Sequence, residues 1–355
     1  MKSGKIWSTL VDYFLILSAI IGVGFASGKE ICVFFFDYGM GSMFGLLAFG
    51  LLYIYLFLVI QYVQKKCEMN SYSEFNSRIF GRLCKISEIV ILINFTITSA
   101  GMLAGADYLF ETFFGIGYKL PSIILTILTF ILLIGGIERI KFMANLIIPV
   151  MIAVIVINSI GNITPQNVHL EINTQNSFLA IYYGLLFGVN NFVATLPVLF
   201  ETKLKTKGKI AVILSVCLII LLNILVFASN SFDTDMPMFE LSANISIWFY
   251  YIYFATLIMG LFSTLMICSY NMKKIIAKDK KSIFIPLFIV LFNLILSNVG
   301  YAFIVKYLYV VSGIVSGVYV IVLIIMMTIR LIQYKQLKSK PKFTNKEDLD
   351  KNNPD

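Results

Sequence analysis

The sequence contains little charge and almost no histidine. Only 13% of its 355 residues are Asp, Glu, Lys or Arg, and His169 is the single histidine. A soluble domain averages about a quarter charged residues, so this composition excludes an ordinary water-soluble fold. Enzyme centres are commonly built from clustered histidines, carboxylates or cysteines, and the sequence has no such cluster, phosphate-binding loop or nucleophile motif. We therefore expect that the chain is not an enzyme.

Cysteine is also sparse, and its spacing indicates neither a metal site nor a disulfide framework. The five cysteines lie in apolar segments or short basic loops, as Cys32, Cys67, Cys84, Cys217 and Cys268. We expect reduced thiols without a catalytic role and no resident cofactor. The net charge of +9 is spread over separate loops rather than gathered on one surface, which argues against nucleic acid as a partner.

Hydrophobic residues make up 59% of the chain and gather in long apolar stretches. A bilayer span needs about 20 mostly apolar residues, and within lipid a lone segment satisfies its backbone hydrogen bonds only as a helix. The first stretch follows a basic N-terminus but is too long for a secretion signal. We predict an all-α membrane protein of about ten helices, with spans near 8–36, 41–64, 86–113, 121–137, 142–160, 177–200, 210–230, 246–272, 283–300 and 307–332.

The positions of the basic residues predict how the spans are oriented. With the N-terminus inside, 25 of the 28 Lys and Arg residues fall on the cytoplasmic side, in agreement with the positive-inside rule. Only Lys29, Lys119 and Lys306 lie outside. We predict a bacterial inner-membrane protein in contact with lipid, with both termini cytoplasmic and a disordered cytoplasmic tail at 334–355.

The spans divide into two halves of similar plan, residues 1–164 and 165–333. Because each half contains an odd number of spans, the second half enters the membrane with the opposite polarity. This predicts two inverted five-helix repeats, an arrangement common in secondary transporters. The alternative is that any ten-helix protein with similar loops shows such regularity by chance.

Glycine and polar residues interrupt the first span of each half. Span one carries the run 22–28, GVGFASG, and span six carries Gly184 and the run 188–191, GVNN, before Pro197. Interruptions at corresponding positions point to the binding site of a transporter, because an unwound backbone exposes N–H and C=O groups to a ligand. We predict that spans one and six are both discontinuous. The alternative is that the glycines allow close helix packing.

The run 22–31, GVGFASGKEI, resembles the signature of the YkvI-type bacterial membrane proteins, a branch of the amino acid–polyamine–organocation transporter superfamily. The resemblance implies the inverted-repeat fold of the bacterial leucine transporter, with substrate held between spans one, three, six and eight. On this sequence the expected substrate contacts are Gly22, Gly24, Ala26, Ser27, Gly28, Thr98, Ser99, Gly188, Asn190 and Asn191.

Sodium-coupled members of that fold hold a cation between carbonyls of the broken first span and two adjacent hydroxyls of span eight. Span eight here has a similar spacing in the run 260–264, GLFST. The resemblance therefore implies a sodium site, whose oxygen ligands suit an alkali ion, at Ile21, Gly24, Gly260, Ser263 and Thr264. Alternatively, the two hydroxyls bond to the backbone of their own helix.

Four charged residues in or near the spans are candidates for gating, because ionisable groups within a membrane are functional candidates by default. Lys29, in the outer half of span one, is expected to pair with Asp107 on span three. Asp12 lies near the cytoplasmic end of span one, where it either pairs with a loop lysine as an inner gate or reaches the interface. In a proton-coupled mechanism, Glu30 or Asp107 would be the titrating group.

No Lys, Arg or His falls at the middle of the predicted pocket, which favours a neutral or zwitterionic solute such as an amino acid. We therefore expect a secondary transporter that works by alternating access and is coupled to a cation, with sodium favoured over a proton. The alternative is a ligand-sensing or channel-like membrane subunit of a larger complex with the same fold.

Overall fold

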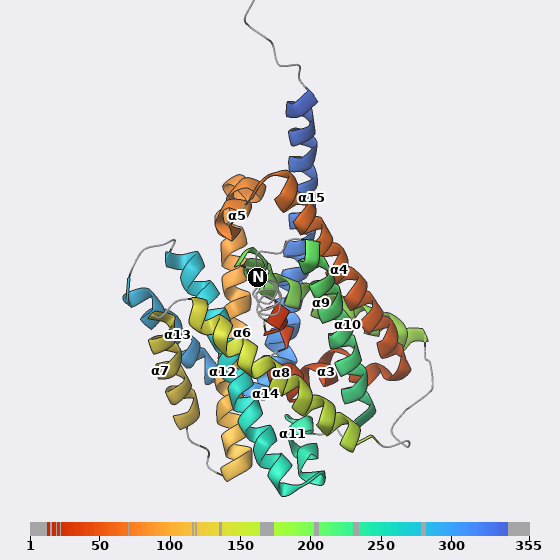
Figure 1. Cartoon of the computed structure of the whole chain (residues 1–355), viewed down its shortest axis with the longest axis vertical. Coiled ribbons are helices and arrows are strands. Elements are labelled where there is room, and N and C mark those ends of the chain that lie inside the picture. The colour runs from red at the N-terminus through yellow and green to blue at the C-terminus, as the bar shows by residue number, and fades with distance from the viewer. Residues whose placement is uncertain are drawn as a thin grey trace, which may run out of the picture.

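All regular elements in the described part of the chain are helical in the structure, which is a computed structural model (Figure 1). The described residues are 13–14, 16–18, 20–21, 23–69, 71–115, 117, 119–134, 137–163, 174–201, 206–229, 234–277 and 282–339. The all-α class predicted from the sequence is confirmed for these residues.

Each expected span from the second to the tenth coincides with one long helix. These helices are α4 (Ser42–Lys66), α6 (Cys84–Phe114), α7 (Leu120–Ile134), α8 (Ile137–Gly161), α9 (Thr174–Glu201), α10 (Thr206–Ser229), α12 (Ile247–Ala277), α13 (Phe284–Ser297) and α15 (Tyr309–Ser339). In the described residues, 5 helical segments are long and apolar enough to cross a membrane, and shorter apolar helices separate some of them along the chain. The chain is therefore a helical membrane protein, while the count of ten spans and the inverted repeat stay predictions.

The long helices form two packed groups (Figure 1). In one group α6 and α12 pack against each other and against α7 and α13; in the other, α4 packs against α9 and α10. α8 contacts α10 and α12, and α15 contacts α6 and α9, so these two helices join the groups. One cluster of buried hydrophobic side chains runs through both groups, and the candidate site lies between them.

A short amphipathic helix, α5 (Tyr72–Phe80), lies at the same end of the molecule as the C-terminal turns of α15 (Figure 1). Ser71 caps it, since its side chain accepts a hydrogen bond from the Glu74 amide at 3.2 Å. The sequence pattern placed this segment in a cytoplasmic loop, so α5 was not expected. α15 continues to Ser339 and includes the first part of the predicted tail, whereas 340–355 lie outside the described residues.

The remaining short elements lie at the ends of long helices. They are η2 (Gly81–Leu83), α11 (Pro237–Leu241), η4 (Ser242–Asn244), α14 (Tyr301–Phe303) and the π-helical turn η5 (Ile304–Leu308). α11 lies at the opposite end of the molecule from α5 (Figure 1), which is the outer side in the predicted orientation. The π-helical turn directly precedes α15, and such turns are frequent at functional sites.

The first span is broken into short pieces, as predicted. These pieces include α2 (Val23–Ala26), α3 (Lys29–Phe34) and the 3-10 turn η1 (Phe36–Gly41). The break between α2 and α3 falls at Gly28, whose φ of 84° lies in the left-handed region that glycine adopts without strain. Gly28 is the N-cap of α3, and the Ser27 Oγ accepts a hydrogen bond from the Lys29 amide, the first of this helix, at 3.3 Å. The local sequence thus explains why this span does not continue as one helix.

Span six is not broken, and the prediction of a discontinuity there is wrong. α9 runs without interruption through 184–191, with Pro197 inside it. A Cβ on Gly184 would lie 2.2 Å from the carbonyl oxygen of Gly45, and a Cβ on Gly45 would lie 2.4 Å from that of Ala180. These glycines let α4 and α9 approach closely, which is the packing alternative.

The asparagines of α9 find hydrogen-bond partners without unwinding the helix. Asn191 Nδ2 donates to the Phe187 carbonyl at 2.9 Å, and the Asn191 carbonyl accepts from Thr195 Oγ1 at 2.6 Å. Asn190 Oδ1 accepts a hydrogen bond from Asn94 Nδ2 on the neighbouring helix α6. Polar side chains in membrane helices commonly bond to their own or a neighbouring helix, so the Gly-Asn pattern did not require an open backbone.

Gly184→Ala is expected to destabilise the protein, because the added methyl group would collide with the backbone of α4. We expect a loss of about 1–3 kcal/mol, measured as a fall of several degrees in the thermal unfolding midpoint of the purified protein. Gly317→Ala is the matched control, since the nearest atom to its added Cβ is 3.9 Å away. Equal midpoints for the two variants would contradict the close contact between α4 and α9.

Candidate functional site

The break in the first span is closed by hydrogen bonds from other parts of the chain. The Ala26 carbonyl accepts from the Tyr253 hydroxyl at 2.7 Å, and the Ser27 carbonyl accepts from the Met238 amide at 3.0 Å. The hydroxyls of Ser27 and Tyr301 lie 2.9 Å apart. Since lipid offers no hydrogen bonds, backbone groups freed inside a membrane protein need such partners. Each of these two carbonyls therefore already accepts one hydrogen bond from the protein.

α11 covers this break. A Cβ on Gly28 would come within 2.8 Å of Met238 Cγ, so α11 rests directly on the glycine. Asn158 Nδ2 donates to the Met238 carbonyl at 2.6 Å, and Asn162 Nδ2 donates to the Leu241 carbonyl at 3.2 Å. Both asparagines lie at the C-terminal end of α8, so α8 fixes α11 in its place over the break.

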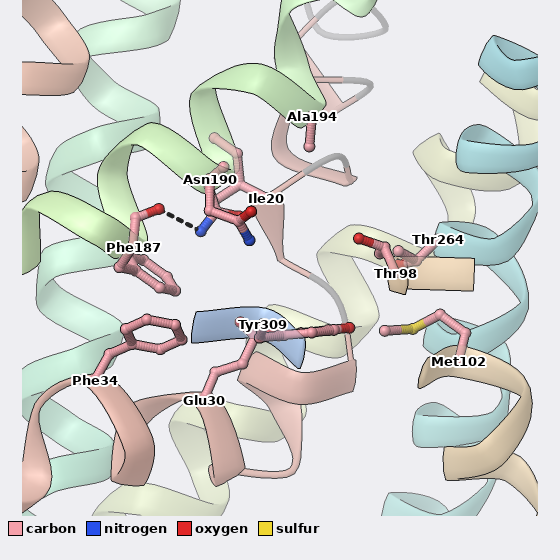
Figure 2. Close-up of a pocket in the computed structure, with 11 residues that line it drawn as sticks. Ile20, Glu30, Phe34, Thr98, Met102, Phe187, Asn190, Ala194, Thr264 and Tyr309 are labelled. Carbon is pink, nitrogen blue, oxygen red and sulfur yellow. Dashed lines mark hydrogen bonds between the residues drawn. The ribbon is translucent and has the colours of Figure 1, made fainter. Parts of the chain in front are cut away.

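A small cavity of about 20 Å³ lies beside the broken span (Figure 2). Its lining comes from the first span, α6, α9, α12 and α15, through Ile20, Glu30, Phe34, Thr98, Met102, Phe187, Asn190, Asn191, Ala194, Thr264 and Tyr309. A volume of about 10–15 Å³ already holds a water molecule, so the cavity in this conformation admits a small ion or one or two waters. Spans one, three, six and eight, between which the resemblance places a substrate, all contribute to it.

Glu30 is the acidic side chain in this lining, and it is only 7% exposed. A Cβ on Gly24 would lie 2.1 Å from Glu30 Oε1, so the carboxylate folds back over α2 into space that only glycine leaves open. No described residue forms an ion pair or a hydrogen bond with this carboxylate. Burying an ionised carboxylate costs much free energy unless a positive charge accompanies it or the group takes up a proton.

Aromatic rings form the wall of the cavity next to Glu30 (Figure 2). The ring centroids of Phe34 and Phe187 lie 5.5 Å apart, and Phe49 of α4 packs against Phe187 at 5.2 Å. Tyr309 lies beside Glu30, and its buried hydroxyl has no hydrogen-bond partner in the described part of the chain. The wall therefore consists of packed aromatic rings and carries one hydroxyl group without a partner among the described residues.

Asn190 links three helices at the cavity. Its Oδ1 accepts from Asn94 Nδ2 at 2.6 Å and from Ser312 Oγ at 2.8 Å, which joins α9 to α6 and α15. Asn94 was not among the expected site residues, although it lies one helical turn before Thr98 on the same face of α6. Thr98 donates to the Asn94 carbonyl at 3.0 Å, so its hydroxyl proton is already used.

One hydroxyl of the pair in span eight lies at the cavity. Thr264 is part of the lining, and Ser263 is buried beside it in α12. Neither hydroxyl has a hydrogen-bond partner among the described residues, whereas Thr256 of the same helix donates to the Ile252 carbonyl at 2.7 Å. Bonding to their own helix therefore does not account for these two hydroxyls.

The other expected sodium ligands are backbone carbonyls of the first span and of α12. The Gly24 carbonyl accepts from Ser27 Oγ at 3.2 Å, which leaves one lone pair for a further partner. Ile21 and Gly260 are buried, and the preceding Ile20 lines the cavity. Hydroxyl and carbonyl oxygens together fit the chemistry of an alkali ion.

The outer ion pair expected between Lys29 and Asp107 is wrong. Lys29 Nζ lies 2.5 Å from Asp235 Oδ1, and it also donates to the Thr234 carbonyl at 3.3 Å. Asp107 pairs instead with Lys119, at 3.2 Å. The docking of α11 on the broken span brings the segment before α11 to Lys29, while the short connection between α6 and α7 places Lys119 near Asp107.

The structure brings some of the expected residues together and separates others. Those that line the cavity are Glu30, Thr98, Asn190, Asn191 and Thr264. The other described residues of the expected site do not line it: Ile21, Gly24, Ala26, Ser27, Gly28, Lys29, Ser99, Asp107, Gly188, Gly260 and Ser263. Ala26, Ser27 and Gly28 form the break itself, and Gly188 faces Phe49 of α4. Gly22 and Asp12 lie outside the described residues.

The hydrophobic part of the lining was not predicted. These residues are Ile20, Phe34, Met102, Phe187, Ala194 and Tyr309. Helical spacing was an available signal, since Phe34 and Met102 follow Glu30 and Thr98 by one turn on the same faces. Tyr309 had no such signal, because the packing of the π-helical turn against α6 decides where α15 begins.

A double-mutant cycle tests the ion pairs. Lys29→Ala and Asp235→Ala should show a coupling energy of about 0.2–1 kcal/mol in thermal stability, because their side chains are 16% and 28% exposed and remain partly hydrated. Lys29→Ala and Asp107→Ala should be additive, since each residue has another partner. Additivity in the first cycle together with coupling in the second would restore the pair expected from the sequence.

Comparison with known proteins gives a partial match, and no family model matches the chain. The chain is similar to the uncharacterized membrane protein YkvI of Bacillus subtilis (strain 168), with 29% identity over 143 residues, or 39% of this chain and 40% of that protein. It is also similar to the uncharacterized protein YyaD of the same organism, with 27% identity over 144 residues and the same two shares. The chain thus matches about 40% of the length of these relatives. This likeness supports a membrane protein similar to YkvI, while the wider superfamily stays a prediction.

Proposed function

We propose that the chain is a secondary transporter for a small organic solute and works by alternating access. The observation that carries the proposal is the polar cavity beside a broken first span, lined from both halves of the chain. Discontinuous helices at an interior cavity are where secondary transporters place substrate and coupling ions. Enzymatic activity forms no part of the proposal.

Helix packing supports the proposed inverted repeat. An inverted repeat pairs α6 with α12, α7 with α13, and α8 with α15, so each contact should recur between the paired helices. The contact of α6 with α13 has its counterpart in α12 with α7, and that of α12 with α8 has its counterpart in α6 with α15. These reciprocal contacts favour two related halves over a chance similarity in loop lengths.

During the proposed transport cycle the backbone bends only in the first span, because α9 is a continuous helix. α4 and α9 are locked together through Gly45 and Gly184 and would move as one body. The chain between Ser27 and Gly28 is the flexible joint, since glycine in the left-handed region tolerates a change of backbone angle. α11 rests on this joint and closes its outer side.

An amino acid needs more room than the cavity offers in this conformation. We therefore assign the structure to a closed state of the cycle, in which the two helix groups have come together around the broken span. Solute would enter when the groups move apart, as in other proteins that close around a ligand.

Sodium is the coupling ion in this proposal, held by the hydroxyls of Ser263 and Thr264 and by carbonyls of Ile21, Gly24 and Gly260. Support comes from the two adjacent hydroxyls, which are buried and have no partner among the described residues, with Thr264 in the lining of the cavity. A bound sodium ion would supply positive charge at the cavity and tie α12 to the broken span.

Thermal unfolding of the purified protein in sodium chloride and in potassium chloride tests the ion site. A ligand at 100 times its dissociation constant stabilises the folded state by about 2.7 kcal/mol, which corresponds to a midpoint several degrees higher. We expect this rise in sodium only, and its loss in Ser263→Ala/Thr264→Ala. Thr256→Ala is the matched control and should keep the response, because its hydroxyl is already bonded within α12. Equal midpoints in both salts would count against sodium.

Uptake into proteoliposomes completes this test. Solutes that stabilise the protein should accumulate under an inward sodium gradient and stop accumulating when the gradient is dissipated. A solute that binds without any uptake would instead indicate the sensing subunit.

A further inference from the structure

The corner between α5 and α6 carries basic side chains that have no role in the proposed transport cycle. Arg82 lies in the turn η2 and Lys85 in the first turn of α6, and both residues are exposed. Neither forms an ion pair or a hydrogen bond with a residue that the structure describes. Arg330 of α15 brings a third positive charge to the corner, since its Nε donates to the Ile79 carbonyl at 3.4 Å.

Gly81 allows Arg330 to come this close to the corner. It ends α5 with a φ of 54°, in the left-handed region that glycine adopts without strain. A Cβ on Gly81 would lie 2.9 Å from Arg330 Nη2, so the guanidinium group lies against the backbone directly before Arg82. The C-terminal part of α15 and the start of α6 therefore share one positively charged surface, at the end of the molecule where α5 lies (Figure 1).

An exposed apolar stripe of α6 begins directly beside these basic residues. Ile86, Ile89 and Ile93 share one face of the helix, and all three are exposed. Arg82 and Lys85 each precede an isoleucine of this stripe by one helical turn. An exposed apolar face of a membrane helix contacts lipid, and long basic side chains at the end of such a face reach the headgroups. Arg82 and Lys85 therefore lie at the depth of the headgroups, on the predicted cytoplasmic side.

The acidic side chains of α5 and of the start of α6 do not cancel this positive charge. Glu74 of α5 already pairs with Arg78, at 2.7 Å. Glu88 of α6 is partly buried, and its Oε1 accepts a hydrogen bond from Cys84 Sγ at 3.8 Å. Three basic residues thus stand against one further carboxylate. The corner attracts anions and disfavours a headgroup that ends in an ammonium group.

We propose that Arg82 and Lys85, together with Arg330, bind the phosphate of an anionic phospholipid such as phosphatidylglycerol. A guanidinium group donates two parallel hydrogen bonds to a phosphate, and the acyl chains of the lipid would lie along Ile86 and Ile89. The bound headgroup would join α15 to the start of α6, because it contacts basic side chains from both. This lipid site goes beyond the proposed transport function and does not depend on it.

Thermal unfolding of the full-length protein in nanodiscs of defined lipid tests the proposal. One set of nanodiscs contains phosphatidylcholine alone, and a second set contains phosphatidylcholine with added phosphatidylglycerol. We expect a midpoint several degrees higher with phosphatidylglycerol, because a ligand that binds only the folded state stabilises it. Equal midpoints would overturn the proposal. An equal rise on adding inorganic phosphate to pure phosphatidylcholine nanodiscs would also overturn it, since the site would then bind free phosphate.

Variants locate the site, and native mass spectrometry of protein titrated with phosphatidylglycerol measures the affinity. Arg82→Ala/Lys85→Ala should bind the lipid about thirtyfold more weakly, from the usual contribution of two basic residues at an anionic surface. Lys65→Ala/Lys274→Ala is the matched control, because it removes two exposed basic residues from other helices on the same predicted side. It should bind as wild type. An unchanged affinity in the first variant, or the same loss in both, would overturn the site.

Discussion

Every backbone N–H and C=O group buried in a membrane protein needs a hydrogen-bond partner, and the structure around the first span follows from this constraint. A break at Gly28 frees carbonyls in the interior, and Tyr253 and Met238 donate to two of them. α11 lies over the break because it provides one of these donors. The freed carbonyls thus form hydrogen bonds that stabilise the fold. The groups that can contact a ligand in the cavity are mainly side chains, above all those of Glu30 and Thr264.

The first span is broken and α9 is continuous, although both contain glycine-rich runs, and the difference has a physical reason. In the first span, Gly28 takes a left-handed conformation at the start of α3 and the Ser27 hydroxyl accepts from the Lys29 amide, so the chain turns locally. In α9, Gly184 faces Gly45 at a distance that admits no side chain, and the helix stays whole. Both patterns consist of glycine beside polar residues. Only the neighbouring helix decides between a break and a close contact, and a single sequence does not contain that neighbour.

What the sequence predicted best depends on local periodicity. Apolar length placed the helices from α4 to α15, and the composition of residues 22–28 placed the break. Part of the site was also predicted, because Thr98, Asn190 and Thr264 lie on faces that the polar pattern marks. The ion pairs were not predictable, since Asp235 is remote in sequence from Lys29 and reaches it only through the docking of α11. Phe187 and its aromatic neighbours were missed because an apolar residue in a membrane span carries no sign of which cavity it faces.

An experimental density map of the protein in lipid nanodiscs is the most direct test of the central claim, which is an asymmetric pair of spans around one cavity. We expect a chain that breaks at Gly28, with the Tyr253 hydroxyl on the Ala26 carbonyl, beside an α9 that is continuous from 174 to 201. A first span that continues as one helix from residue 23 to 34, with Glu30 facing lipid, would contradict it.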